Sequence, residues 1–137
     1  DHTGRITNVD ASPLITTLSR ATIAVVPPLA ISSDGPLNID GDRAAAAIAG
    51  ALSAESLVIL SNVRGLYRNF PDESSFVDHI RAPQINEAMH WAQGRMKRKV
   101  LGVQTALEGG VQRVIIGDGR NNQPVSRAMA GEGTVFT

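Results

Sequence analysis

An alanine-rich stretch, residues 36–52 (PLNIDGDRAAAAIAGAL), constrains the fold of this chain more than any other feature. Alanine is the best helix former, and the six alanines of this stretch predict a helix with little side-chain bulk. A turn at residues 34–36 (DGP) precedes the helix, so that Asn38, Asp40 and Asp42 gather where it begins. We expect this slim helix to lie close to a sheet and to hold Asn38 and Asp42 rigidly at the sheet edge.

Asp42 has two interpretations. A carboxylate at a helix start accepts hydrogen bonds from the free backbone N–H groups of the first turn, and its charge suits the positive end of the helix dipole. On that interpretation Asp42 is an ordinary helix cap. The alternative is a functional carboxylate that the closely packed helix holds in place, and spacing alone does not decide between the two.

Strand and helix patterns alternate along the whole chain. Residues 56–60 (SLVIL) form a continuous apolar run, which is typical of a parallel strand buried on both faces. Further strands are expected at residues 4–9, 22–26, 76–80, 112–117 and 134–137, with an extended segment at 29–32. Helices are expected at residues 14–19 after Ser12 as N-cap, at 83–93, through Val100, Val103 and Leu107 up to Gly109, and at 124–130. This alternation predicts a single α/β domain with a mainly parallel sheet.

The turn after the apolar run, residues 61–65 (SNVRG), is the first candidate binding site. In an open α/β sheet, ligands bind in the crevice beyond the carboxyl ends of the strands. The following loop, residues 66–75, is polar apart from Leu66 and two aromatic residues, Tyr67 and Phe70, which we expect to fold back onto the protein.

A basic helix start provides the second candidate. Arg95, Lys97, Arg98 and Lys99 lie in the first turn of the helix that begins near residue 95. The helix dipole disfavours positive charge there by about 0.3–1 kcal/mol per residue unless an anion neutralises it. The pattern therefore predicts a bound anion such as phosphate.

Composition excludes several classes of protein. The 137 residues include 13 basic and 13 acidic side chains and no cysteine, which argues against a nucleic-acid or anionic-membrane binder, a disulfide scaffold and a thiolate metal site. The histidines, His2, His79 and His90, lack metal-binding spacing, so we expect no protein-bound metal. No apolar run is long enough to cross a bilayer. The chain begins at Asp1 without an initiator Met, and we expect it to be a fragment of something larger.

The common nucleotide and hydrolase motifs are also absent. The sequence contains neither a P-loop, nor a Rossmann glycine fingerprint, nor a G-x-S-x-G elbow. A P-loop enzyme, a Rossmann dehydrogenase and an α/β-hydrolase therefore lose support.

Five segments together carry a resemblance. In order, NIDGD with AAAAIAGAL, LVILSNVRGLY, GRMKRKVLGVQTALEGG and GEGTVF resemble the carboxy-terminal, nucleotide-binding half of the amino acid kinase family. Within it, the chain is most similar to the acetylglutamate kinase group and to its lysine-pathway branch, which acts on aminoadipate or glutamate attached to an amino-group carrier protein. The resemblance implies a three-layer sandwich, the carbamate kinase-like fold, for residues 1–137 as one domain.

The family's reaction transfers the γ-phosphoryl group of ATP, with Mg²⁺ carried by the nucleotide, to a side-chain carboxylate, forming an acyl phosphate. The resemblance implies that Lys99 stabilises the transferring group, that Asp42 holds the catalytic lysines and that Asn38 binds the amino-acid substrate. It also implies which residues lie along ATP: Asn62, Val63, Gly65, Leu66, Tyr67, Phe70, Gln93, Gly94 and Met96.

The departures from the family pattern matter as well. Ser61, Asn62 and Val63 stand where arginine-pathway enzymes usually have Thr-Asp-Val, and GRMKRK replaces Gly-Gly-Met-x-x-Lys. The extra cations either meet an acidic carrier protein or form a solvated basic turn. The family's amino-terminal half, with its glycine-rich loop, second catalytic lysine and most of the dimer contact, is not in this sequence.

Three functional hypotheses follow. The first is a cytoplasmic biosynthetic kinase, a homodimer or higher oligomer, that acts on a small molecule or on a carrier-linked substrate and binds neither nucleic acid nor membrane. The second is a non-catalytic nucleotide- or effector-binding module of the same fold. The third is a related kinase acting on aspartate, carbamate or a nucleoside monophosphate. On the first hypothesis the isolated chain is expected to be inactive.

Overall fold

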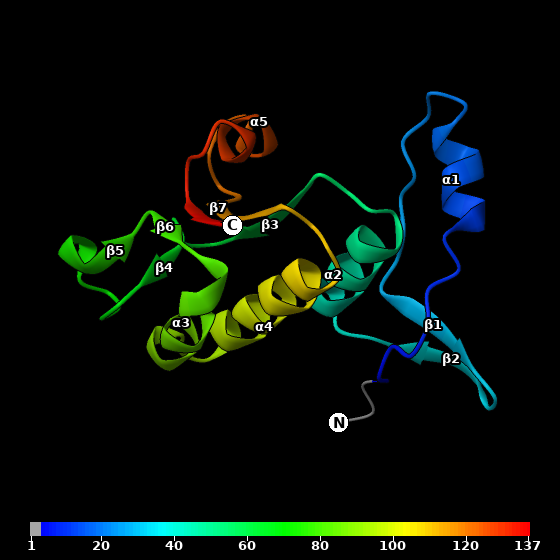
Figure 1. Ribbon diagram of the computed structural model, residues 1–137, viewed down its shortest axis with the longest axis horizontal. Helices are drawn as coiled ribbons and strands as arrows, with labels where there is room; N and C mark the ends of the chain where they lie inside the picture. The colour runs from blue at the N-terminus through cyan, green and yellow to red at the C-terminus, as the bar shows by residue number, and fades with distance from the viewer. Residues whose placement is uncertain (1–3) are drawn as a thin grey trace.

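The computed structural model describes residues 4–137, and its main sheet has four strands (Figure 1). In spatial order they are β3 (Ser56–Ser61), β7 (Arg113–Asp118), β8 (Thr134–Phe136) and β6 (His79–Ile80). The β3–β7 and β6–β8 pairs are parallel, whereas β7 and β8 are antiparallel. The predicted α/β fold with a mainly parallel sheet is thus confirmed.

Helices lie on both faces of this sheet. One face carries α2 (Gly41–Ala51), α3 (Ile85–Trp91) and α4 (Arg95–Glu108), and the other carries α5 (Pro124–Met129) (Figure 1). This arrangement gives the three layers that the resemblance implied.

The core lies mainly between α4 and strand β7. Val100 and Val103 of α4 and Val114 and Ile116 of β7 are fully buried in one apolar cluster. Successive strand residues point to opposite faces, so Ile115, also fully buried, faces the α5 layer. Strand β7 is therefore covered on both sides.

Strand β3 differs from its prediction. The run SLVIL was expected to be buried on both faces, but only Ile59 is buried and Leu60 is 36% exposed. The reason is its position, because β3 is the edge strand of the main sheet in the described part of the chain.

The alanine-rich helix α2 packs closely, but mainly against α4 rather than against the sheet. Gly102 of α4 allows the close approach, since a Cβ atom there would lie 3.2 Å from the carbonyl oxygen of Asp42. Further along, the backbones of Gly50 and Gly109 meet in the same way. The small residues thus fix the beginning of α2 against the first half of α4.

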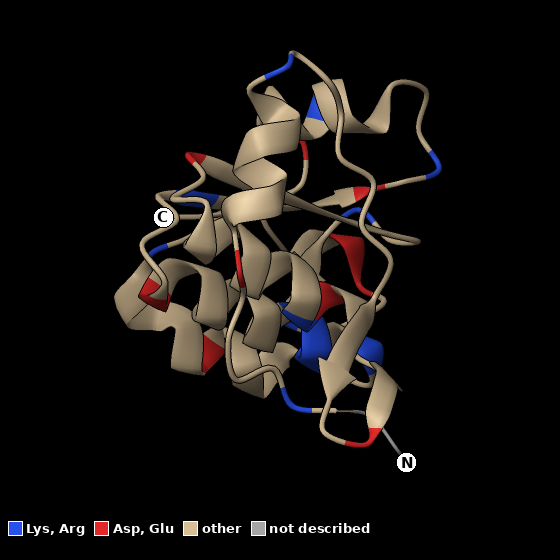
Figure 2. Cartoon of the chain, turned by 90° about the vertical axis from the view of Figure 1, so that its right-hand side faces the viewer, with Lys and Arg blue, Asp and Glu red and all other residues tan. Residues whose placement is uncertain are grey.

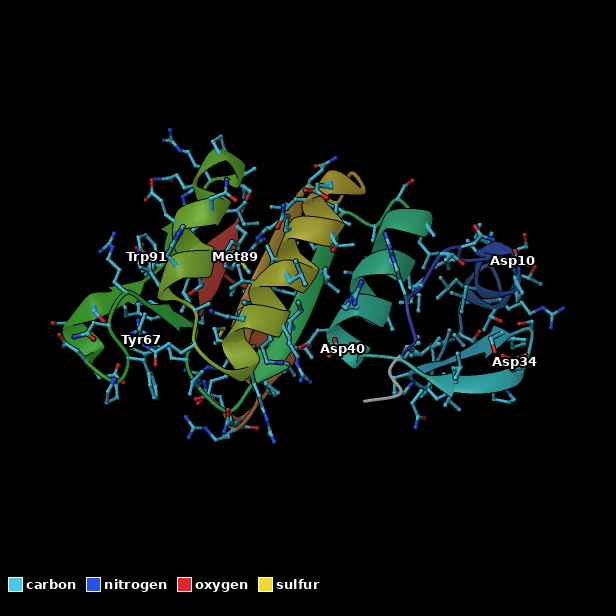
Figure 3. The ribbon with its side chains drawn as sticks, turned by 90° about the horizontal axis from the view of Figure 1, so that it is seen from below. Asp10, Asp34, Asp40, Tyr67, Met89 and Trp91 are labelled. Atoms are coloured by element: carbon cyan, nitrogen blue, oxygen red, sulfur yellow. The ribbon has the colours of Figure 1, made fainter. Side chains whose placement is uncertain are left out.

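The first part of the chain extends away from this layered body (Figures 1 and 3). It contains α1 (Ser12–Leu18) and an antiparallel hairpin of β1 (Leu29–Ser32) and β2 (Gly35–Asn38). Figure 3 shows Asp10 and Asp34 in this part, at the opposite end of the molecule from Tyr67 and Trp91. The predicted extended segment at residues 29–32 is confirmed as β1.

Three predictions for this part are wrong. Of the strand expected at residues 4–9, the structure has only a bridge between Gly4 and Ile39. Residues 22–26 form no strand, because within residues 4–137 no neighbouring strand pairs with them. Ser12 is the first residue of α1 rather than its N-cap, which is Ala11.

The remaining elements are short. Strands β4 (Leu66–Tyr67) and β5 (Phe76–Val77) form a small hairpin closed by the 3₁₀ turn η1 (Glu73–Ser75), and η2 (Ala82–Gln84) leads into α3. The strand predicted at residues 76–80 is divided between two sheets as β5 and β6. Within residues 4–137, no helix is both long enough and apolar enough to cross a membrane.

Candidate functional site

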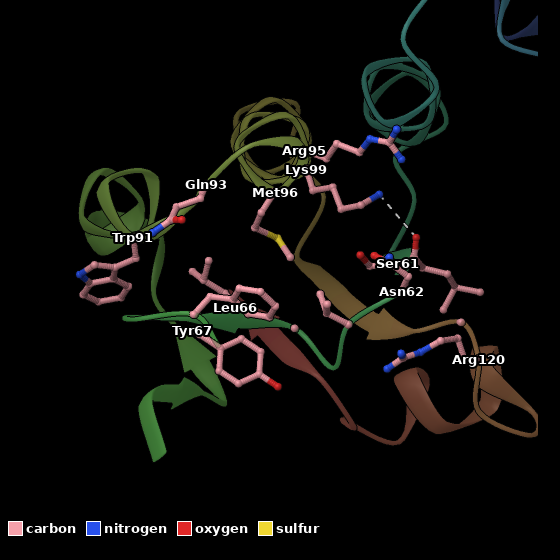
Figure 4. A pocket seen from close by; sticks show the side chains of 15 residues that line it. Ser61, Asn62, Leu66, Tyr67, Trp91, Gln93, Arg95, Met96, Lys99 and Arg120 are labelled. Carbon is pink, nitrogen blue, oxygen red and sulfur yellow. Dashed lines mark hydrogen bonds between the residues drawn. The ribbon is translucent and has the colours of Figure 1, made fainter. Parts of the chain in front are cut away.

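A cleft of about 770 Å³ opens at the carboxyl ends of β3 and β7, between them and the start of α4 (Figure 4). Eight of the nine predicted nucleotide-binding residues line it: Asn62, Val63, Gly65, Leu66, Tyr67, Phe70, Gln93 and Met96. Lys99, the predicted catalytic lysine, lines it as well. The structure therefore brings two segments about 30 residues apart in the sequence, 62–70 and 93–99, to the same site.

Thr134, from the GEGTVF segment, fixes the β4 side of the cleft. Its fully buried hydroxyl accepts a hydrogen bond from the Leu66 backbone N–H (2.8 Å) and donates one to the Val77 carbonyl (2.6 Å). Gly65 fits against this residue only because it lacks a side chain, since a Cβ atom would lie 2.9 Å from the Thr134 backbone nitrogen. The turn after β3 is thereby held in one conformation.

An aromatic cluster supports the loop beside the cleft. The ring of Tyr67, which is buried, meets Phe70 and Phe76 edge-on at 5.6 and 5.5 Å. The Tyr67 hydroxyl donates to the Glu73 carboxylate at 3.0 and 3.1 Å, and burial, with the Glu73 contact, raises the pKa of Tyr67. The prediction that Tyr67 folds back is confirmed, whereas Phe70 stays 50% exposed at the rim.

Lys99 and Asp42 form the ion pair at the centre of the site. The Lys99 ammonium donates to both carboxylate oxygens of Asp42 at 3.2 Å and reaches the Leu60 carbonyl at 3.5 Å. Both side chains are largely shielded, with 16% of Lys99 and 25% of Asp42 exposed. Asp42 thus holds the ammonium at the end of β3, on the wall of the cleft.

The helix cap of α2 is Asp40, not Asp42. The Asp40 carboxylate accepts the backbone N–H of Arg43 at 3.1 Å and lies 3.9 Å from the Arg98 guanidinium. The capping interpretation of Asp42 is therefore wrong, because its carboxylate turns to Lys99 instead. Figure 2 shows basic and acidic residues side by side where these two helices begin.

The first turn of α4 has no side-chain cap and carries cations. Its N-cap, Gly94, has φ +51° and no side chain that could cap the helix. Two of the four cations, Arg95 and Lys99, line the cleft, as expected for residues four apart on one helix face. Lys97 and Arg98 are exposed and do not line it. The backbone N–H groups of Met96 and Lys97 donate to the carbonyls of Gln93 and Gly94 at 2.9 and 3.3 Å, so the side-chain cations are the main attraction for an anionic ligand.

Three predicted site residues do not line the cleft. Asn38 ends strand β2, Gly94 is the N-cap of α4, and Asp42 reaches the cleft only through its ion pair with Lys99. Sequence reasoning also missed Trp91 and Arg120, which do line the cleft. For Arg120 a signal existed, because it follows strand β7 and the carboxyl ends of parallel strands share an edge.

No cluster of three or more His, Cys, Asp or Glu side chains suited to a metal occurs among the described residues. His79 contacts the Thr137 hydroxyl at 2.9 Å and His90 the Asn86 carbonyl at 2.6 Å. His2 lies outside the described residues.

Known proteins are similar to this chain in sequence and in fold. The model of the amino acid kinase family matches residues 1–118. A [LysW]-aminoadipate kinase of Deinococcus radiodurans is 48% identical over 138 residues, covering all of this chain and 47% of the relative. An acetylglutamate kinase of Corynebacterium glutamicum is 40% identical over 118 residues, covering 85% of this chain and 40% of the relative. The chain thus spans about half the length of these relatives.

Solved structures agree. An N-acetylglutamate synthase of Neisseria gonorrhoeae, solved with coenzyme A and L-arginine, superimposes with a TM-score of 0.87 at 30% identity, covering 100% of this chain and 32% of that one. A carbamate kinase of Giardia lamblia bound to AMP-PNP gives a TM-score of 0.74 at 22% identity, covering 98% of this chain and 46% of that one, and so shares the fold. On the match of its sequence over residues 1–118, this chain belongs to the amino acid kinase family.

Proposed function

We propose that this chain is the carboxy-terminal, ATP-binding half of a kinase that phosphorylates the side-chain carboxylate of an N-blocked acidic amino acid. The observation that carries the proposal is the shielded Lys99–Asp42 pair at the wall of a cleft built from the family's nucleotide segments. The relatives of greatest identity named above are kinases of this kind.

The chemistry follows from the placement of the charges. In phosphoryl transfer, negative charge spreads over the equatorial oxygens of the moving group, and catalysis consists of positioning and charge neutralisation. Lys99, held by Asp42, offers a fixed ammonium for that charge, and Arg95 at the start of α4 offers a second cation for the neighbouring phosphates. The apolar residues Trp91 and Met96, which line the cleft and are half-buried, offer a surface for the base.

The Mg²⁺ that accompanies ATP in such kinases would be held by phosphate oxygens. None of the described residues that line the cleft is a carboxylate, and the side-chain oxygens of Ser61, Asn62 and Gln93 are the uncharged ligands available there. The proposal is therefore a metal that arrives with the nucleotide.

The acceptor is acetylglutamate, or aminoadipate or glutamate attached to an acidic carrier protein, and Asn38 contributes to its binding. The 48% identity with a [LysW]-aminoadipate kinase favours the carrier-linked substrate. Exposed Lys97 and Arg98 beside the cleft are then available to an acidic carrier. A solvated basic turn without a partner is the alternative for these two residues.

The rest of the active site lies in an amino-terminal half of the same polypeptide. This half covers the apolar residues that the present chain leaves exposed, of which Ile23, Val25 and Ile31 are at least 90% exposed. It supplies a second catalytic lysine and the phosphate loop, and it forms most of a homodimer contact. As a biosynthetic kinase, the complete protein works in the cytoplasm.

A non-catalytic nucleotide- or effector-binding module of the same fold is the alternative. The likeness to an N-acetylglutamate synthase is the observation that favours it. The Lys99–Asp42 pair favours the kinase, because a module that only binds an effector needs no shielded ammonium held by a carboxylate at the wall of the cleft.

Titration with ATP and Mg²⁺ tests the proposal. Amide NMR signals of residues 61–67 and 94–99 should shift together, because both segments border the cleft. Perturbations that cluster at residues 131–137 instead, or no binding at all, would contradict it.

A further inference from the structure

Trp91, the last residue of α3, is the only tryptophan of the 137 residues, and it lines the cleft (Figure 4). The indole is half-buried, and its buried part packs against the apolar core. Ala88 and Ala92 on either side of it are buried in the same core at 0% and 1% exposure. These residues anchor the end of the helix, and the open part of the indole is left for a ligand.

The Arg68 side chain holds the indole from outside the cleft. Its guanidinium lies 5.1 Å from the centroid of the Trp91 ring, within the range of a cation–π contact. Arg68 does not line the cleft, so the part of the ring that it covers is not the part that lines the cleft. The core and Arg68 together fix the ring in one orientation, which lowers the entropy cost of binding a flat ligand.

The position of Trp91 separates it from the cations of the cleft. Trp91 belongs to the helix that packs against β4, whereas Lys99 reaches the Leu60 carbonyl at the end of β3. Met96 lies between the two (Figure 4). A ligand that fills the cleft therefore meets a flat aromatic surface at one end and positive charge at the other. A nucleotide has this combination, because its planar base is joined through a sugar to its phosphates.

The size of the indole determines which bases it holds best. Aromatic side chains bind bases by stacking on their flat faces, whatever donors and acceptors lie at the edges of the bases. A two-ring purine covers more of an indole than a one-ring pyrimidine does, and the stabilisation grows with the apolar area that is removed from water. A cleft wall formed by Trp91 therefore favours purines.

We propose that Trp91 stacks on the base of the bound nucleotide and is the residue that makes the cleft select purine over pyrimidine nucleotides. This inference rests on the proposed ATP site. It assigns to the end of α3 a base specificity that the cations of α4 do not provide, because the phosphates are the same in all nucleotides.

Calorimetric titration of the full-length polypeptide with ATP, CTP and inorganic tripolyphosphate, each with Mg²⁺, tests the inference. We expect ATP to bind more tightly than CTP. Trp91→Leu keeps an apolar side chain but removes the flat ring, and it should weaken ATP binding by on the order of tenfold, weaken CTP binding less and leave tripolyphosphate binding unchanged. Trp91→Phe keeps an aromatic face and should retain most of the affinity for ATP.

Indole fluorescence gives a second readout. The emission that the unmodified polypeptide has and the Trp91→Phe variant lacks belongs to this residue, whatever other tryptophans the longer polypeptide contains. ATP should change this emission because the base contacts the ring, and tripolyphosphate should leave it unchanged.

Met89→Ala is the matched control. Met89 is also a half-buried side chain of α3 that packs against the core, but it does not line the cleft. Its replacement loosens the packing of the same helix without changing the wall of the cleft. The affinity for ATP and the preference over CTP should therefore stay as in the unmodified polypeptide.

Four results would overturn the inference. Equal weakening of ATP and tripolyphosphate binding by Trp91→Leu would show a structural role without a base contact. Unchanged ATP binding in that variant, or a purine preference that survives the replacement, would exclude selection by Trp91, and so would equal affinity of the unmodified polypeptide for ATP and CTP. Failure of the unmodified polypeptide to bind any of the three probes is distinguishable, because it would overturn the proposed function itself and this inference with it.

Discussion

Residues 41–137 enclose a buried apolar core, whereas residues 4–40 have none. The first region buries a continuous core between α4 and the sheet, including Val100, Val103 and Ile116 at 0% exposure. The second region has no buried residue. Eight large apolar side chains between residues 15 and 37 are exposed, and Ile23 and Val25 are each 90% exposed.

The difference shows that residues 41–137 form their own buried core, whereas residues 4–40 do not. Exposed apolar patches of this kind are rare on monomers and mark surfaces that another part of a protein covers. Residues 22–26 also have the apolar, β-branched composition of a buried strand, but they have no strand beside them in residues 4–137. The chain covers only 47% of its relative from Deinococcus radiodurans, and the proposed amino-terminal half would supply this cover.

The largest expected effect concerns activity. On the proposed function, the 137-residue chain alone should form no acyl phosphate, because the amino-terminal half proposed to supply the phosphate loop and the second lysine is not present. Trapping with hydroxylamine, in parallel with the full-length polypeptide, measures this. Product formation by the short chain would show that the second region needs no partner.

A matched pair of substitutions, one in each region, compares how much each region contributes to the free energy of unfolding. In the isolated chain, Ile116→Ala should lower the free energy of unfolding by about 2–5 kcal/mol, because it opens a cavity in the core. Ile23→Ala should change it by at most ~0.5 kcal/mol, as at an exposed site. Urea unfolding measures both.

The same pair in the full-length polypeptide is the control. There we expect Ile23→Ala to cost about as much as Ile116→Ala, because the amino-terminal half then buries Ile23. An Ile23→Ala effect that stays small in the longer protein would show that residues 22–26 are a true surface.

The smallest expected effect is a pH dependence of the stability of residues 41–137, which contain Asp118. The hydrogen bonds from the Arg120 side chain lower the pKa of Asp118 from 3.8 to about 2. A lowered folded-state pKa stabilises the fold above the ordinary value, and this contribution disappears as the pH falls from about 4 to about 2. Carboxyl-carbon NMR should give a midpoint near 2, and Arg120→Met should move it up toward 3.8.

Sequence reasoning predicted which segments line the cleft better than it predicted the strands of residues 4–40. The two segments that line the cleft were recognisable because strand ends and a basic helix start carry local signals, and the Lys99–Asp42 contact followed from the family resemblance. The cap is Asp40 because α2 begins at Gly41, whereas the partner of Asp42, Lys99, lies 57 residues away and has no local signal.

The failed strand predictions have a different cause. The composition of residues 22–26 is that of a strand, but a strand forms only where a neighbour accepts its hydrogen bonds. The exposed edge of β3 has the same explanation, because an apolar run indicates burial without saying which segment provides it.

The central claim is that Lys99 stabilises the transferring phosphoryl group, and kinetics of the full-length kinase test it most directly. A fixed ammonium in a shielded site stabilises the transition state more than bound ATP. Lys99→Ala should therefore lower kcat by on the order of 10²–10³ with a much smaller change in the KM for ATP. Lys99→Arg should not restore the rate, because a planar guanidinium does not replace a compact ammonium.

Lys97→Ala is the control in that measurement, because Lys97 is an exposed cation of the same helix turn that does not line the cleft. Lys97→Ala should lower the affinity for ATP or for the carrier protein, and this loss should become smaller at high salt. A large, selective loss of kcat for Lys99→Ala would agree with the account. Equal losses of kcat for Lys97→Ala and Lys99→Ala would contradict it and would show that the basic turn acts only as a diffuse attractor of anions.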